Sequence, residues 1–155
     1  MHIHVIAIGQ RMPGWIQQGV DDYAKRLPPQ FGFRIIELAA TKRGSGAPHK
    51  AIAEEGERLL QAVPKGARII ALDERGRQWR TREVAQALDD WTHDGRDVAL
   101  LIGGADGHSD AVRARAERLW SLSALTLPHG LVRILLTEQL YRAWSLLGGH
   151  PYHRD

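Results

Sequence analysis

The chain has 155 residues, of which 43% are hydrophobic and 25% charged, which is the composition of one ordinary globular domain. It contains no cysteine, which excludes disulfides, thiolate nucleophiles and cysteine metal sites, and we expect no bound metal. The formal net charge of +3 favours a polyanionic partner such as nucleic acid without establishing one. Because the first residues lack a signal-peptide pattern and no apolar run is long enough for a membrane span, we expect a soluble, cytoplasmic protein.

Strand and helix patterns alternate along the whole chain. Short apolar runs predict strands, and stretches with apolar residues at helical spacing predict the helices between them. Strands are expected at 2–9, 31–38, 67–73, 97–104 and 121–127. Helices are expected at 13–27, 47–63, 81–91, 109–119 and 131–147, the third with Thr81 and the fourth with Ser109 at its start. This alternation predicts one α/β domain, residues 1–155, in which a mainly parallel sheet has helices on both faces.

Two segments fall outside this alternation. The basic segment ATKRGSGAPHK (40–50) is either a solvated connection or a loop that contacts phosphate. The tail GGHPYHRD (148–155) has no periodicity, and such tails are usually frayed. It is nevertheless rich in groups that stack on bases or bind phosphate, namely Tyr152, Arg154 and two histidines.

A glycine-rich loop follows the fourth predicted strand, in the sequence VALLIGGADGHSD (98–110). Gly103, Gly104 and Gly107 do not have the spacing of a dinucleotide-binding or Walker loop, and no Lys or Arg is present to pair with phosphate. Asp106 would also repel a phosphate group. Two interpretations remain open: the backbone approaches a ligand that has no phosphate, or the loop is a structural turn.

The last predicted helix is apolar around nearly its whole circumference. A helix of this kind is buried on all sides, so we expect one side to pack on the sheet and another on a second subunit, as in a homodimer. Glu138 and Arg142 lie four residues apart on this helix. They form either a stabilising ion pair or a charged pair held at an interface beside a substrate.

Several segments of the sequence are distinctive. They are VIAIGQRMPGW (5–15), KRG (42–44), LDERG (72–76), LLIGGADG (100–107), SLSALTLPHGLVRILLTEQLYRAWSL (121–146) and HPYHRD (150–155). Together they resemble the RlmH family of bacterial ribosomal RNA methyltransferases, a small member of the SPOUT class. The resemblance runs the length of the chain.

The resemblance implies an α/β fold with a C-terminal trefoil knot, which hydrophobic periodicity cannot indicate. It also implies a homodimer that uses S-adenosyl-L-methionine to methylate N3 of a pseudouridine in 23S ribosomal RNA on assembled ribosomes. The residues implied to bind the cofactor are Leu72, Gly103, Leu122, Ser123, Ala124, Leu125, Thr126 and Leu127. Because this ligand has no phosphate and carries a sulfonium cation, its site is expected to offer backbone groups and apolar walls, with few cationic side chains.

The hypothesis for catalysis concerns the last helix and the tail. N3 of the base must lose a proton, and a cation near the ring would stabilise the resulting negative charge. Arg142 and Arg154 are the candidates for that cation, with Glu138 orienting Arg142. Tyr152 and His153 are expected to stack on or hydrogen-bond the flipped base, with His153 as the candidate proton acceptor.

Other interpretations stay open at this point. The alternative role for each of these catalytic candidates is phosphate contact or packing in the dimer, and His129, beside Pro128 at a helix start, is expected to be structural. We also expect the tail of one subunit to complete the cofactor site of the other. The main alternative function is a non-catalytic RNA-binding or ribosome-associated factor of the same fold, and a second is a SPOUT enzyme that acts on transfer RNA.

Overall fold

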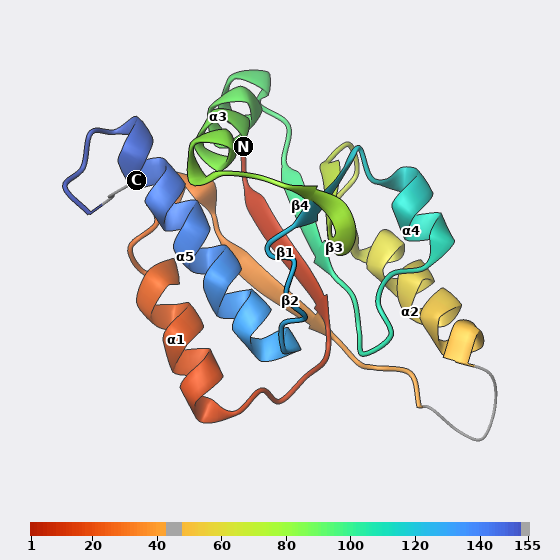
Figure 1. The fold of residues 1–155 in the computed structure, drawn as a ribbon. Helices are drawn as coiled ribbons and strands as arrows, with labels where there is room; N and C mark the ends of the chain where they lie inside the picture. The colour runs from red at the N-terminus through yellow and green to blue at the C-terminus, as the bar shows by residue number, and fades with distance from the viewer. Residues whose placement is uncertain (43–47, 153–155) are drawn as a thin grey trace.

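A parallel sheet runs through the middle of the structure, a computed structural model that describes residues 1–42 and 48–152 (Figure 1). Within those ranges the strands are β1 (Ile3–Ile8), β2 (Arg34–Leu38), β3 (Arg68–Gln78), β4 (Val98–Ile102) and β5 (Arg118–Ser121). They lie in the order β2-β1-β4-β3-β5, and every neighbouring pair is parallel. The predicted parallel sheet is confirmed.

Helices cover both faces of this sheet (Figure 1). One face carries α1 (Gly14–Ala24), α3 (Thr81–Asp94) and α5 (His129–Leu147), and the other carries α2 (Pro48–Ala62) and α4 (Asp110–Arg115). A short 3-10 helix, η1 (Pro29–Phe31), precedes β2. Each face has its own apolar core, one that includes Leu88 and Leu140 and one that includes Leu59 and Val112. The prediction of helices on both faces is confirmed.

The central strands are apolar at nearly every position because both of their faces are covered. All residues of β1 and of β4 are buried, and the two strands pair in a register that places Ile3 opposite Val98. Because all five strands are parallel, their carboxyl ends lie at one edge of the sheet. The loops that follow β1, β4 and β5 therefore meet at that edge, and residues 72–75 within β3 lie beside them.

Two predicted helix starts and one predicted helix end are tested by the structure. Ser109 is the N-cap of α4, and its hydroxyl accepts a hydrogen bond from the Val112 amide at 3.2 Å, as expected. The N-cap of α3 is Arg80 and not Thr81, and the Glu83 carboxylate accepts a bond from the Arg80 amide at 3.0 Å. The prediction that α4 extends to residue 119 was wrong, because the chain becomes extended at Ala116 and enters β5.

The prediction of a fifth strand at 121–127 was also wrong, since β5 ends at Ser121. Local hydrogen bonds turn the chain after that residue: the Ser121 hydroxyl donates to the Ser123 carbonyl at 2.9 Å, and the Leu125 amide donates to the Ser123 hydroxyl at 2.9 Å. Serine side chains that bond nearby backbone in this way compete with strand pairing. Residues 122–127 form a loop, in which Leu125 is 73% exposed.

Helix α5 is less uniformly buried in this single chain than its composition suggests. Leu135 is 41% exposed and Leu147 is 47% exposed, whereas Arg133, Thr137 and Ser145 are buried. Among the described residues, no helix combines the length and the apolar character needed to cross a membrane. The trefoil knot stays a prediction.

Candidate active site

A cavity of about 410 Å³ opens at the carboxyl edge of the sheet. Its walls come mainly from three separate segments: residues 72–75 in the middle of β3, the glycine loop after β4, and the loop after β5. The residues expected to bind the cofactor that line it are Leu72, Gly103, Leu122, Ser123, Leu125, Thr126 and Leu127. Within the described loop 121–127, only Ala124 is outside the lining. The fold therefore brings together residues that lie more than fifty positions apart in the sequence.

The glycine loop closes on itself. A Cβ at Gly103 would lie 3.0 Å from both the carbonyl carbon and the oxygen of Gly107, and Gly107 has a φ of +84°. The Gly107 amide donates to the Gly104 carbonyl at 3.1 Å. Close packing of backbone on backbone therefore explains Gly103 as part of a turn. The same turn also forms one wall of the cavity. The loop is therefore a structural turn and also places its backbone beside a space for a ligand.

Two charged side chains meet at the floor of the cavity. The Asp73 carboxylate is buried and accepts bonds from Arg113 Nε at 2.7 Å and from the Arg75 amide at 2.8 Å. Burial by itself would raise the pKa of Asp73, but these two donors outweigh burial and lower it. Asp73 is thus an anion at neutral pH.

His108 lies beside this pair and is 4% exposed. Its Nε2 lies 3.2 Å from the Leu101 carbonyl, which requires Nε2 to carry the proton. Burial lowers the pKa of His108, so the ring is neutral and its Nδ1 is an acceptor. Among the described residues, no donor reaches that Nδ1.

The expectation of few cationic side chains holds for the glycine loop but not for the whole cavity. Arg75, in β3, and Arg113, in α4, both line it. The charge of Arg113 is balanced by Asp73, whereas Arg75 is exposed. These arginines approach from other segments, so the composition of the glycine loop did not reveal them.

The first turn of α5 is bonded to the glycine loop. His129 Nδ1 lies 3.1 Å from the Gly103 carbonyl, and His129 Nε2 accepts a bond from Arg133 Nε at 3.1 Å. Arg133 is 2% exposed and also donates to the Gly9 carbonyl at 2.8 Å and to the Glu37 carboxylate. Burial, followed by the Arg133 charge, lowers the pKa of His129. The expectation that His129 is structural agrees with these contacts.

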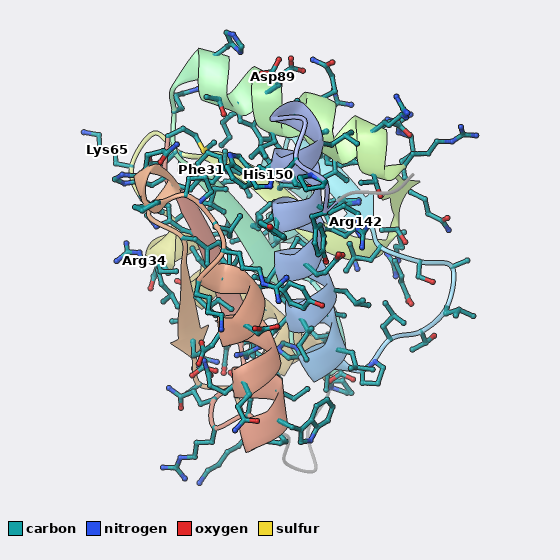
Figure 2. The ribbon with its side chains drawn as sticks, turned by 90° about the vertical axis from the view of Figure 1, so that its left-hand side faces the viewer. Phe31, Arg34, Lys65, Asp89, Arg142 and His150 are labelled. Carbon is teal, nitrogen blue, oxygen red and sulfur yellow. The ribbon has the colours of Figure 1, made fainter. Side chains whose placement is uncertain are left out.

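The candidates for catalysis form a second cluster, toward the C-terminal end of α5. Glu138 accepts bonds from Arg142 Nε at 2.9 Å and from the Tyr152 hydroxyl at 2.7 Å. The Arg142 guanidinium lies 4.9 Å from the centre of the Tyr152 ring. The Glu138 bond raises the pKa of Arg142, and burial with the same carboxylate raises that of Tyr152. Figure 2 shows Arg142 and His150 away from the N-terminal turn of α5.

The two clusters are separate within one chain. Nine residues separate His129 from Glu138, a distance of about 14 Å along an α-helix. None of Glu138, Arg142 and Tyr152 lines the cavity. His153 and Arg154, the other catalytic candidates, lie outside the described residues. The structure thus assembles the expected cofactor residues at one place and three of the expected catalytic residues at another.

Sequence reasoning missed several side chains at the cavity edge. Arg133 and Glu37 hold the start of α5, while Asp73, His108 and Arg113 contribute polar groups to the cavity. Arg133 carries a recognisable signal, because it is a lone cation in the apolar run LVRILL (131–136). A charged residue in a helix without a solvent-facing half is expected to have a buried partner.

Comparison with known proteins addresses the family directly. A family model described as "Predicted SPOUT methyltransferase" matches residues 1–153. The chain belongs to the SPOUT methyltransferase family. The resemblance inferred from the sequence segments is thereby confirmed.

Close relatives of this SPOUT family member have curated names. Over 156 residues, and the whole of both chains, it is 55% identical to the "Ribosomal RNA large subunit methyltransferase H" of Thioalkalivibrio sulfidiphilus (strain HL-EbGR7). It is 54% identical over 155 residues to the protein of the same name from Burkholderia mallei (strain SAVP1), with 99% of each chain covered.

A solved structure shares the fold of this chain at much lower identity. A probable methylase family protein from Haemophilus influenzae Rd KW20 superposes with a TM-score of 0.56 at 12% identity, covering 99% of this chain and 70% of that one. At that identity the likeness concerns the fold alone, and it agrees with the parallel sheet and its covering helices.

Proposed function

We propose that this protein is an S-adenosyl-L-methionine-dependent methyltransferase that modifies ribosomal RNA of the large subunit. The observation that supports this most directly is the cavity, which gathers three separated wall segments at the carboxyl edge of a parallel sheet. Ligands of open α/β sheets bind at that edge. The names of the two curated relatives support the choice of ribosomal RNA as substrate.

The residues at the cavity fit this cofactor. Its volume of about 410 Å³ falls in the range of roughly 300–1,000 Å³ for small-molecule sites. Leu72, Leu122 and Leu127 offer apolar walls for the adenine, and the turn around Gly103 offers backbone groups. The exposed Arg75 suits the methionine carboxylate.

The proposed reaction is transfer of a methyl group to N3 of a pseudouridine. When bound, the cofactor supplies an electrophilic methyl group. The protein must then hold N3 of a pseudouridine in line with that group and stabilise the negative charge left when the imide proton departs. Arg142 suits the second task, because its guanidinium is charged at neutral pH and the bond to Glu138 fixes its direction. Arg154 is proposed for the same role.

The tail has two proposed roles. The Tyr152 ring is packed on Tyr141, with 4.6 Å between ring centres, and its hydroxyl is bonded to Glu138. Because its pKa is raised, Tyr152 keeps its proton at neutral pH and does not act as the base. These contacts favour an anchoring role for Tyr152 over stacking on the flipped base. His153 remains the proposed proton acceptor.

We also propose a homodimer in which two chains share each site. Within one chain the Glu138 cluster lies away from the cavity, so a second chain is needed to bring a catalytic cluster to a cofactor. Leu135 and Leu147 leave apolar surface on α5 that a second copy would cover. A protein that modifies ribosomes is expected to act in the cytoplasm.

Two measurements test the proposed function. Calorimetry of the purified protein with S-adenosyl-L-methionine is expected to show binding, and mass mapping of ribosomal RNA from a strain without this protein is expected to show one methyl group lost from a pseudouridine. No binding together with unaltered RNA would instead indicate a non-catalytic ribosome-associated factor. A methyl group lost from transfer RNA would indicate a different substrate.

A further inference from the structure

We propose that His129 and Arg133 act together as a clasp between the two loops that form the cofactor cavity, and that cofactor affinity depends on this clasp. His129 directly follows the loop 122–128, which is one wall, and bonds the Gly103 carbonyl, which belongs to the other. The inference rests on the proposed function for the identity of the ligand. Arg133 is a positioning residue that acts through His129, and His129, which lines the cavity, positions the Gly103 carbonyl.

The hydrogen-bond pattern determines the form of His129. Arg133 has only donors at its guanidinium, so the His129 Nε2 that lies 3.1 Å from Arg133 Nε must accept. The proton of the neutral ring is then on Nδ1, which donates to the Gly103 carbonyl at 3.1 Å. A single neutral tautomer satisfies both bonds, and a protonated ring would place a second donor against Arg133.

Arg133 is itself held at a defined position. It is 2% exposed, and its remaining donors reach the Gly9 carbonyl and the Glu37 carboxylate. Gly9 follows β1 and Glu37 lies near the end of β2, so this guanidinium joins two strand ends to the first turn of α5. A buried arginine with this many partners has little freedom to move, and neither does the imidazole bonded to it.

The clasp has a direct consequence for binding. The loop 122–127 has no strand partner, and Leu125 within it is 73% exposed. The bond from His129 joins the first turn of α5 directly to the glycine loop. Separation of the two walls would widen the cavity and reduce simultaneous contact with a ligand, because binding then includes the cost of ordering the loops.

Substitutions of His129 separate hydrogen bonding from space filling. His129→Asn places an amide donor near the position of Nδ1, whereas His129→Leu fills a similar volume without any donor. We expect His129→Leu to weaken S-adenosyl-L-methionine binding roughly tenfold, the effect of losing a bond and leaving a carbonyl unpaired. His129→Asn is expected to stay within about threefold of the unaltered protein. A thermal unfolding measurement on each variant serves as the control for correct folding.

A second measurement needs no ligand. Amide hydrogen exchange in residues 104–108 is expected to be faster in His129→Leu than in His129→Asn, because only the leucine variant releases the Gly103 carbonyl. Arg133→Lys, which keeps the charge beside Glu37 but loses the guanidinium geometry, is expected to resemble His129→Leu. Equal exchange and equal affinity in the Asn and Leu variants would overturn the clasp.

The pH dependence supplies a further readout. Arg133 of α5 and Glu37 of β2 are the charged groups that face His129, and His108 lies elsewhere in the cavity wall. Because the pKa of His129 is lowered from 6.5, the clasp persists at pH 6.5 and opens as the pH falls toward that lower pKa. Affinity of the unaltered protein should fall in this acidic range by more than that of His129→Asn, since His108 affects both equally. Identical pH profiles would contradict the proposal.

The outcomes also separate this inference from the proposed function. An unaltered protein that does not bind S-adenosyl-L-methionine would overturn the proposed function, and the exchange comparison would still decide whether the clasp exists. If the unaltered protein binds S-adenosyl-L-methionine and both His129 variants bind it equally tightly, the clasp is overturned and the proposed function stands.

Discussion

Gly103 is held in a turn where backbone meets backbone. An added Cβ would lie 3.0 Å from Gly107 atoms and 3.2 Å from His108 Nδ1, closer than most real contacts. The neighbouring backbone cannot rotate away as a flexible side chain can, so a substitution must change the shape of the loop itself. At the residue scale, the position therefore tests whether the shape of the glycine loop matters for ligand binding.

We expect Gly103→Ala to lower the free energy of unfolding by about 1–3 kcal/mol, the usual cost of forcing an extra methyl group into a packed site. Cofactor affinity measured by calorimetry should fall roughly tenfold, because the cavity wall moves. Gly14→Ala is the matched control: a Cβ there has no atom within 4 Å, so both quantities should stay near those of the unaltered protein. An alanine at 103 with full affinity would mean that the loop is a turn without a role in binding.

Helix α5 performs a different task at each end. Its first turn bonds the glycine loop through His129, its middle packs Leu136 and Leu140 into the core, and its last turns hold the tail through Glu138 and Tyr152. A helix that is apolar on nearly all sides can serve several neighbours because no side is reserved for solvent. At the element scale, its polar residues are therefore points of attachment.

We expect Tyr152→Phe to loosen the tail while the helix stays folded. The substitution removes the hydroxyl that donates to Glu138 and keeps the ring packed on Tyr141. Amide exchange in residues 148–152 should become faster, by an amount that corresponds to roughly 1 kcal/mol for one hydrogen bond. Tyr23→Phe is the control, because it removes a hydroxyl from a tyrosine near the same Arg26 guanidinium and leaves the Glu138 bond intact. Equal exchange in the two variants would show that the Tyr152 hydroxyl does not anchor the tail.

The arrangement of two separate clusters concerns the whole molecule. The cavity lies at the carboxyl edge of the sheet and its lining reaches Val132 on α5. Glu138 lies about 9 Å and Arg142 about 15 Å farther along that helix, and Tyr152, in the tail, is bonded to Glu138. In an in-line methyl transfer the cofactor and the base are in contact, so a cofactor and a cation that act on the same base must both lie next to it. If both clusters take part, the second must come from another chain.

Mixing two inactive variants tests the shared site. One variant lacks residues 153–155 and the other carries Gly103→Val, whose larger side chain should abolish cofactor binding. In an equal mixture with random exchange, half of the dimers are mixed and each has one intact site, so methyl transfer to ribosomes should return to about one quarter of the unaltered level. Each variant mixed with itself is the control. Mixed dimers, verified by native mass spectrometry, that remain inactive would place the whole site within one chain.

The sequence by itself determined the α/β class, because β1 and β4 are buried on both faces and must be continuously apolar. It also determined the family and, through resemblance, seven of the residues that line the cavity. The misplaced fifth strand shows where local patterns fail: Ser121 and Ser123 bond nearby backbone, which turns an apolar segment into a loop.

Only the tertiary structure decided which distant residues share a site. Arg133 lies 124 residues from Gly9 and 96 from Glu37, and no local pattern connects them. Asp73 and Arg113 meet across 40 residues, which placed a cation at a cavity whose glycine loop has none. Periodicity reports which face of an element is buried, but the partner of a buried charge depends on how the elements pack, and that is fixed only when the sheet is assembled.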